Sequence, residues 1–234
     1  MAHRTLELAK TLDQTLLDPA ASSGDIEDVC RRARALHLVS VCVLPAHVRI
    51  AAEELRGCDV KVCAVVGFPS GAASARTKVA EAEEALADGA RALEFVVNQR
   101  AMRSGDVRLV RDDLVSFVRT MRMRSANGGR GVVVLNAVIG TAQLPDNFKQ
   151  LACKIIERAE FDFAQTATGN DDGMATIHDV ELLREYLPEG VGVKACGGIE
   201  TIEDVQAMTN AGASRIGSAL AVELLQSPEL VRAS

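Results

Sequence analysis

VGVKACGGI, at residues 191–199, joins a short apolar strand pattern to a turn of two glycines. Apolar residues alternate along it with the period of a β-strand, and Lys194 falls inside the run. A lysine buried there is costly unless its charge is paired or its pKa falls. Gly197 and Gly198 follow, and with no Cβ in the way their backbone N–H groups can approach an anion. The stretch therefore predicts either an amine beside a phosphate cradle or a lysine that reaches solvent beside an ordinary turn.

The same unit, a short apolar run followed by a helical pattern, recurs along the whole chain. Directly after the opening stretch a helix is expected with Thr201 as its N-cap. The other helices are expected at 25–36, 48–55, 74–86, 106–121, 151–158 and 177–187, with a short helical stretch within 5–17. The strands are expected at 15–17, 38–43, 60–68, 92–97, 132–138, 161–168, 191–196 and 214–218.

Eight such units with nearly continuously apolar strands predict the α/β class and a closed parallel (β/α)8 barrel, the TIM-barrel fold. An open, doubly wound sheet is the alternative, although eight units of this size would be unusual for one. No linker, low-complexity tract or shift of composition divides the chain, so residues 1–234 are expected to form a single domain.

The composition of the chain indicates which classes of partner and which compartment to expect. The formal net charge of −6 argues against nucleic acid, whose phosphates need a basic face. No apolar run approaches the roughly 20 residues of a membrane span, and the N-terminus lacks the apolar core of a signal peptide. The six cysteines and four histidines show no metal-ligand spacing. We expect a cytoplasmic protein with reduced thiols that contacts neither membrane nor nucleic acid and holds no metal.

In a barrel of this kind the chemistry lies at the carboxyl ends of the strands. The residues expected there are Asp13, Cys42, Phe68, Pro69, Glu94, Asn98, Asn136, Gln165, Thr166, Thr168, Lys194, Gly197, Gly198, Gly217 and Ser218. Phosphate sites in such barrels are usually formed by the loops after strands 7 and 8, which here are the two Gly-rich turns. The pattern therefore indicates a small phosphorylated substrate.

These strand ends resemble deoxyribose-phosphate aldolases. The motifs that carry the resemblance are LDQTLL at 12–17, SVCV at 40–43, VKVCAVVGFPSGA at 60–72, TATG at 166–169, VGVKACGGI at 191–199 and RIGS at 215–218. They cover the chain from about Lys10 to Leu220. The resemblance implies a (β/α)8 barrel that cleaves deoxyribose 5-phosphate reversibly into acetaldehyde and glyceraldehyde 3-phosphate. It also implies no metal or organic cofactor, a lysine that forms a Schiff base with the carbonyl, and a homodimer.

The sequence departs from the family pattern at several of these positions. Gln165 stands where the family has its Schiff-base lysine, and Gln165 cannot form an imine. Glu94 replaces an aspartate of the proton relay, and Asn136 replaces a glutamate. Leu44 stands where asparagine is usual, and Gln14 where histidine is usual. So many changes at one end of the barrel indicate a naturally diverged homologue rather than an engineered knockout.

Other positions match. Lys194 corresponds to the second family lysine, which normally lowers the pKa of the first. Gly198 and Ser218 of the phosphate site are present, although Ala219 replaces a further serine. The matching residues argue against the alternative that the active site has been lost and only the packed barrel has been retained.

Two functions from different classes follow. The first is an aldolase-like carbon–carbon lyase with an altered mechanism, in which burial lowers the pKa of Lys194 toward neutrality. Its candidate catalytic residues are Lys194, Glu94, Gln165, Cys42 and Asp13, and its candidate phosphate-binding residues are Thr166, Thr168, Gly169, Gly197, Gly198, Gly217 and Ser218. The second is a non-catalytic binder of a phosphorylated metabolite or a partner protein. If the lyase hypothesis holds, the side chains of Cys42, Glu94, Gln165 and Lys194 point to the same end of the barrel.

The segment 170–173, which follows the sixth expected strand, is expected to be a solvated loop rather than a lid.

Overall fold

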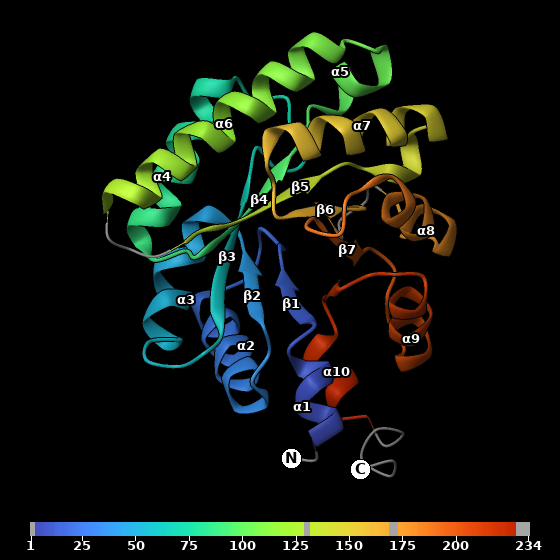
Figure 1. The fold of residues 1–234 in the computed structure, drawn as a ribbon. Coiled ribbons are helices and arrows are strands. Elements are labelled where there is room, and N and C mark those ends of the chain that lie inside the picture. Colours follow the sequence, from blue (N-terminus) through green and yellow to red (C-terminus); the bar gives the residue numbers. More distant parts are fainter. Residues whose placement is uncertain (1–2, 129–131, 169–172, 228–234) are drawn as a thin grey trace.

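The computed structural model describes residues 3–128, 132–168 and 173–227. Its eight parallel strands close into a barrel in chain order, from β1 to β8 and back to β1 (Figure 1). The strands are β1 (Leu12–Leu16), β2 (Ser40–Val43), β3 (Lys61–Val66), β4 (Ala92–Val96), β5 (Val134–Val138), β6 (Phe163–Gln165), β7 (Gly192–Cys196) and β8 (Arg215–Ser218). The predicted barrel is confirmed, and the open sheet is not observed.

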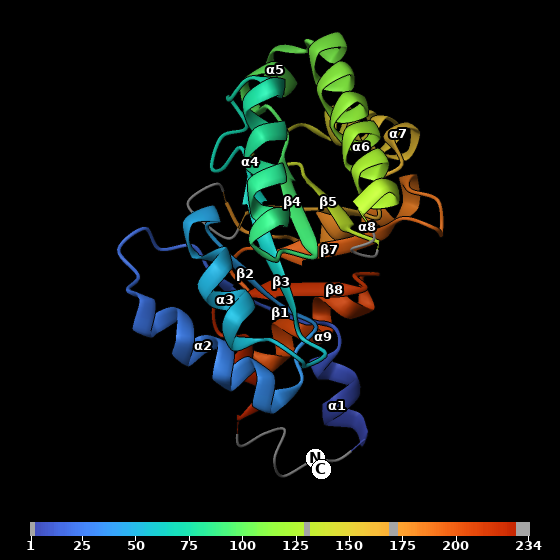
Figure 2. The same cartoon turned by 90° about the vertical axis from the view of Figure 1, so that its left-hand side faces the viewer.

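Helices follow the strands and cover the outside of the barrel (Figures 1 and 2). They are α1 (His3–Ala9), α2 (Ser23–Leu36), α3 (Val48–Glu54), α4 (Ala75–Asp88), α5 (Gln99–Ser104), α6 (Val107–Gly128), α7 (Asp146–Ala159), α8 (Ile177–Tyr186), α9 (Ile202–Asn210) and α10 (Ala221–Leu225), with 3-10 turns η1 (Pro45–His47) and η2 (Thr141–Gln143). Successive helices from α2 to α9 contact one another, α5 aside, and α10 contacts α2.

Both faces of the sheet are buried, which explains why the strands are nearly continuously apolar. On β3, Val62, Ala64 and Val66 face outward and join the large core beneath the helices. Cys63 and Val65 alternate with them and belong to a separate, smaller cluster inside the barrel. This alternation fixes which residues of each strand can reach a site inside the barrel.

Side-chain caps set the starts of several helices. Thr201 Oγ1 accepts from the backbone N–H of Asp204, whose carboxylate accepts from the Thr201 N–H in return, so the predicted N-cap is confirmed as a capping box. Ser22 and Asp25 form the same arrangement at α2. Such caps each stabilise a helix by about 1 kcal/mol.

Element boundaries differ from the sequence-based expectations at a few places. Helix α7 begins at Asp146, directly after Pro145, rather than at Leu151. Helix α6 runs to Gly128 instead of ending at Met121. Strand β1 starts at Leu12, because the polar residues that follow it are buried and pair with both neighbouring strands.

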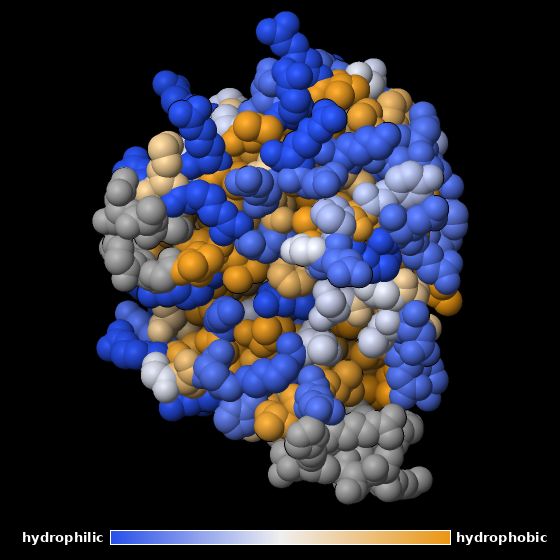
Figure 3. All heavy atoms as spheres, viewed as in Figure 1, coloured by the Kyte–Doolittle hydropathy of each residue, from blue (hydrophilic) through white to orange (hydrophobic). Residues whose placement is uncertain are grey.

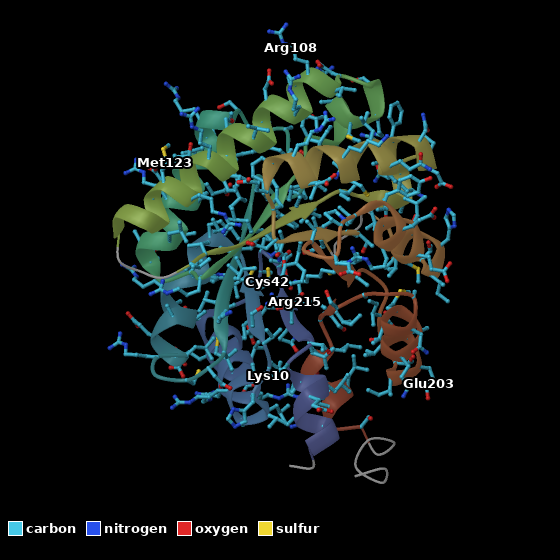
Figure 4. All side chains as sticks on the ribbon, viewed as in Figure 1. Lys10, Cys42, Arg108, Met123, Glu203 and Arg215 are labelled. Atoms are coloured by element: carbon cyan, nitrogen blue, oxygen red, sulfur yellow. The ribbon has the colours of Figure 1, made fainter. Side chains whose placement is uncertain are left out.

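The amino-terminal end of the barrel is closed by packing. Arg215 of β8 lies over the Phe163 ring of β6, with its guanidinium carbon 4.5 Å from the ring centroid. A Cβ at Gly192 would come within 2.3 Å of that ring, so a glycine is needed there. Figure 4 labels Arg215 beside the strands of the barrel.

A buried ion pair outside the barrel was not foreseen from the sequence. Lys78 of α4 is fully buried, and its Nζ lies 2.8 Å from Asp113 Oδ2 of α6 and 3.0 Å from the Val96 carbonyl oxygen. The Nζ also lies 4.2 Å from the Phe95 ring centroid. Burial lowers the pKa of Lys78 although Asp113 acts in the opposite direction. The pair joins α4, α6 and β4.

The outer surface offers no helix that could span a bilayer, within the part of the chain that is described. On the face shown in Figure 3, hydrophobic side chains are interspersed among hydrophilic ones. All six cysteines are free thiols, and five of them are buried.

Candidate active site

The interior of the barrel is polar at positions that branched apolar side chains usually fill. The inward-facing polar residues are Asp13, Ser40, Cys42, Cys63, Glu94, Asn136, Gln165 and Lys194, all of them buried. Burying so many polar groups is costly unless they bond to one another or to a ligand. This layer is therefore the candidate active site, and the label of Cys42 in Figure 4 marks its place within the barrel.

Lys194 joins three strands inside this layer. From β7 its Nζ lies 2.7 Å from Glu94 Oε1 of β4 and 2.9 Å from Asp13 Oδ2 of β1. Ser40 Oγ of β2 donates a hydrogen bond to the other Asp13 oxygen. Lys194 and Glu94 are each 1% exposed. The prediction that Glu94 and Lys194 face the same region is confirmed.

The charge state of Lys194 differs from the sequence-based expectation. Burial alone would lower its pKa, but the carboxylates of Asp13 and Glu94 outweigh burial and raise the pKa well above its ordinary value. The expected shift toward neutrality was wrong because the sequence did not show that two carboxylates contact one amine. Lys194 is an ammonium ion at neutral pH.

Gln165 occupies the neighbouring position on β6, in register with Lys194. Its Nε2 donates to Glu94 Oε2 at 3.0 Å and to the Ala167 carbonyl oxygen at 2.7 Å. Because both partners accept hydrogen bonds, they fix the orientation of the amide. Its Oε1, like Asn136 Oδ1, is a buried acceptor without a hydrogen-bond partner among the described residues. The site therefore has two acceptors that a hydroxyl group or a water molecule could satisfy.

Cys42 and Cys63 complete the layer beside Glu94. They are paired across β2 and β3, and Cys63 Sγ lies 3.7 Å from Glu94 Oε1. The hydrogen bond with Cys63, together with burial, raises the pKa of Cys42 well above its ordinary value. The two Sγ atoms and a Glu94 oxygen lie within 4.8 Å of one another, a spacing that could hold a metal ion. However, both Glu94 oxygens already bond to Lys194 or Gln165, so this carboxylate is engaged by the protein.

A small cavity of about 130 Å³ lies at the carboxyl ends of β7 and β8. It is lined by Thr15, Cys196, Gly197, Gly198, Ile199, Glu200, Gly217, Ser218, Ala219 and Leu220. We call it the distal cavity. It brings together four of the expected phosphate-binding residues, namely both glycines after β7 and the Gly217–Ser218 pair.

The remaining expected phosphate-binding residues are placed differently. Thr166 Oγ1 donates to the Cys196 carbonyl oxygen and accepts from the Cys196 N–H, each at 2.9 Å, so this hydroxyl links β6 to β7. Thr168 is buried in the segment that follows β6. Gly169, and residues 170–172 of the expected solvated loop, lie outside the described residues.

Two of the positions that depart from the family pattern have structural contacts. Gln14 Nε2 donates to the Ala219 carbonyl oxygen at 2.6 Å, and its Oε1 accepts from the Val222 N–H at 3.0 Å. Gln14 therefore ties β1 to the start of α10 rather than reaching the site. Leu44 packs against the inner cluster that contains Cys42 and Cys63.

Comparison with known proteins agrees with this geometry. The model of the DeoC/LacD family aldolases matches residues 8–221. The chain belongs to the DeoC/LacD aldolase family. The deoxyribose-phosphate aldolase of Caldanaerobacter subterraneus subsp. tengcongensis is 40% identical over 221 residues, which are 94% of this chain and 93% of that one.

Solved structures of DeoC-type aldolases share the barrel. The aldolase QR15 superposes with a TM-score of 0.86 at 31% identity, over 96% of each chain. The tetrameric deoxyribose phosphate aldolase of Aeropyrum pernix gives a TM-score of 0.85 at 26% identity, over 99% of this chain and 100% of that one. Membership of the family supports an aldolase-type lyase over a non-catalytic binder.

Asn136 was expected at a strand end and lies in this layer, whereas Ser40 and Cys63 were not among the candidate site residues. Each alternates with outward-facing apolar residues, in step with Cys42 and Glu94. This alternation along each strand is visible in the sequence, and it places these polar side chains on the inner face of the barrel.

Proposed function

We propose that the protein is a carbon–carbon lyase that cleaves a small β-hydroxy aldehyde or sugar in its open-chain form. Lys194 acts in it as an ammonium ion and Glu94 as the base. The observation that supports this most strongly is the contact of one buried ammonium with two carboxylates, 2.7 and 2.9 Å away. An ammonium held in a low-dielectric site stabilises a developing oxyanion much more than it would in water.

The reaction needs no other reactant. Glu94 takes the proton of the β-hydroxyl group, the bond between the α and β carbons breaks, and the β carbon becomes a carbonyl. The electron pair of that bond forms an enolate, whose oxygen is stabilised by the Lys194 ammonium. Glu94 then returns its proton to the α carbon, which releases the smaller aldehyde.

An imine mechanism has less support in this chain. The amide nitrogen of Gln165 is not a nucleophile. Lys194 would have to lose a proton first, and each unit by which its pKa exceeds the ambient pH reduces the neutral amine about tenfold. The raised pKa of Lys194 therefore favours the ammonium role.

The finer expectations from the sequence belong to this proposal. They are that the substrate carries a phosphate held at the turns after β7 and β8, that the protein is cytoplasmic, and that it forms a homodimer. Light scattering would measure the oligomeric state of the protein.

A coupled assay of acetaldehyde release from 2-deoxyribose and from 2-deoxyribose 5-phosphate tests the activity. We expect turnover of at least one sugar, with loss of at least about 100-fold in Lys194→Met because the oxyanion loses its partner. The matched control is Lys154→Met on the exposed face of α7, which should leave the rate unchanged. Binding of a sugar without turnover by the folded protein would instead indicate the non-catalytic binder.

A further inference from the structure

A cavity of about 670 Å³ lies near the amino-terminal ends of β3 and β4, beside the last turns of α3 and α4. We call it the basal cavity, because the distal cavity lies at the carboxyl ends of the strands. Its volume is typical of a pocket for a small molecule. Four cationic side chains line it, namely those of Arg49, Arg56, Lys61 and Arg91. They gather in a chain whose formal net charge is −6.

Carboxylates of the protein compensate these cations only in part. Within the described residues, none of the four cations forms an ion pair, although Glu53, Asp59 and Asp88 also line the basal cavity. Asp59 is paired with Lys10 and with His37, whose Nδ1 lies 3.2 Å from Asp59 Oδ1. The hydrogen bond from Lys10 lowers the pKa of Asp59 to about 2. Four cations therefore face two unpaired carboxylates, and the basal cavity attracts anions.

Helix ends account for only part of this group of cations. The carboxyl ends of α3 and α4 favour a positive charge, and Arg91 Nη1 donates to the Gly89 and Ala90 carbonyl oxygens at 3.1 and 2.8 Å. The Nε and Nη2 of Arg91 have no hydrogen-bond partner among the described residues. The side chains of Arg56 and Lys61 are exposed and donate no hydrogen bond within that part of the chain either. Donors therefore remain for a ligand.

We propose that the basal cavity binds a small molecule that carries two phosphate groups. The cations come from two sides: Arg49 and Arg56 lie on α3 and directly after it, whereas Lys61 and Arg91 lie at the starts of β3 and β4. One phosphate group can meet each pair, and a guanidinium binds a phosphate through two parallel hydrogen bonds. The described residues that line the cavity include no aromatic side chain on which a nucleotide base could stack. The assigned class is therefore a pyrophosphate or a sugar bisphosphate rather than a nucleotide.

Isothermal titration calorimetry at fixed ionic strength, with inorganic pyrophosphate and inorganic phosphate as probes, tests the proposal. Pyrophosphate should bind at least about tenfold more tightly than phosphate, because it can meet both pairs of cations. Arg56→Glu/Lys61→Glu should weaken pyrophosphate binding at least about tenfold, since two cations become anions. The matched control is Arg108→Glu/Lys154→Glu, which makes the same change of net charge on the exposed faces of α6 and α7 and should weaken it less than about threefold. Equal weakening in the two double variants would overturn the proposal.

Two further signals locate the bound anion. In NMR spectra, pyrophosphate should move the backbone amide signals of Gly57 and Lys61, whereas binding at the distal cavity would move those of Gly198 and Ser218. Cys58 also lines the basal cavity and is the one cysteine that is not buried, so saturating pyrophosphate should slow its alkylation by iodoacetamide. Shifts confined to the distal cavity, with an unchanged rate of Cys58 alkylation, would refute the proposal. Because these experiments measure binding alone, their result does not depend on the proposed lyase activity.

Discussion

Lys194 Nζ lies 2.7 Å from Glu94 Oε1, inside a barrel where both residues are almost completely removed from solvent. The strands that carry them, β7 and β4, are far apart in the chain and are separated in the barrel by β5 and β6. A buried pair of this kind contributes little net stability, because desolvation offsets the attraction between the charges. Its presence in a layer with further unpaired acceptors fits a catalytic role better than a purely structural one.

Removal of the Lys194 ammonium should lower the stability of the folded protein at neutral pH. Lys194→Met leaves the carboxylates of Asp13 and Glu94 buried without a counter-charge, and we expect the free energy of unfolding to fall by about 3–5 kcal/mol. Urea denaturation of the parent protein and of Lys194→Met at pH 7 measures the loss. Lys194→Met/Glu94→Gln removes one of the two uncompensated charges and should recover part of the stability. No recovery in the double variant would contradict the paired-charge account.

Alkaline titration provides a second check on the same lysine. Its folded-state pKa is raised above the unfolded value, so the stability that it contributes is fully present below about pH 10.5 and is lost as the pH rises through the folded-state pKa. Between about pH 6.5 and 9 the lysine stays charged, and kcat should show no rise attributable to an amine. A tenfold increase in kcat per pH unit across this range would mean that the neutral amine is the reacting species.

Restoring a lysine on β6 should create a second reactive amine. In Gln165→Lys the new side chain would lie beside Glu94 and Lys194, where two neighbouring ammonium groups repel and one pKa falls. Borohydride with deoxyribose 5-phosphate or deoxyribose should then trap an adduct at position 165, visible in the intact mass and located by peptide mapping. Gln165→Met is the matched control and should trap nothing at that position. If Gln165→Lys folds and binds the sugar without an adduct, the surrounding residues do not form an aldolase-like imine pocket.

The buried ion pair between Lys78 and Asp113, outside the barrel, should affect the stability of the protein but not its catalytic rate. Asp113→Ala leaves the Lys78 ammonium buried without its partner, and we expect a loss of about 3–5 kcal/mol in the free energy of unfolding. The double variant Lys78→Met/Asp113→Leu removes both charges and should recover most of this loss. For all of these proteins kcat should stay within about twofold of the parent value at temperatures where they are folded. A large fall in kcat with unchanged stability would show that α4 and α6 influence the site.

The fold could be predicted because its signals are local. Apolar runs and helix caps such as Thr201 mark each βα unit, and eight units suffice to predict the barrel. The positions of Glu94, Gln165 and Lys194 at one shared site also followed, since strand ends of a barrel converge. The charge state of Lys194 did not follow, because it depends on the distance to Asp13 across the barrel. Nor did the contacts of Ser218, whose hydroxyl is engaged by backbone groups that no sequence pattern reveals.

The most direct test of the central claim is borohydride trapping of the unmodified protein during measured turnover of 2-deoxyribose or its 5-phosphate. The account predicts acetaldehyde release with no increase in the intact mass, because Lys194 acts as an ammonium ion and forms no imine. A mass increase located on Lys194 would contradict it and would show that this lysine has taken over the Schiff-base role.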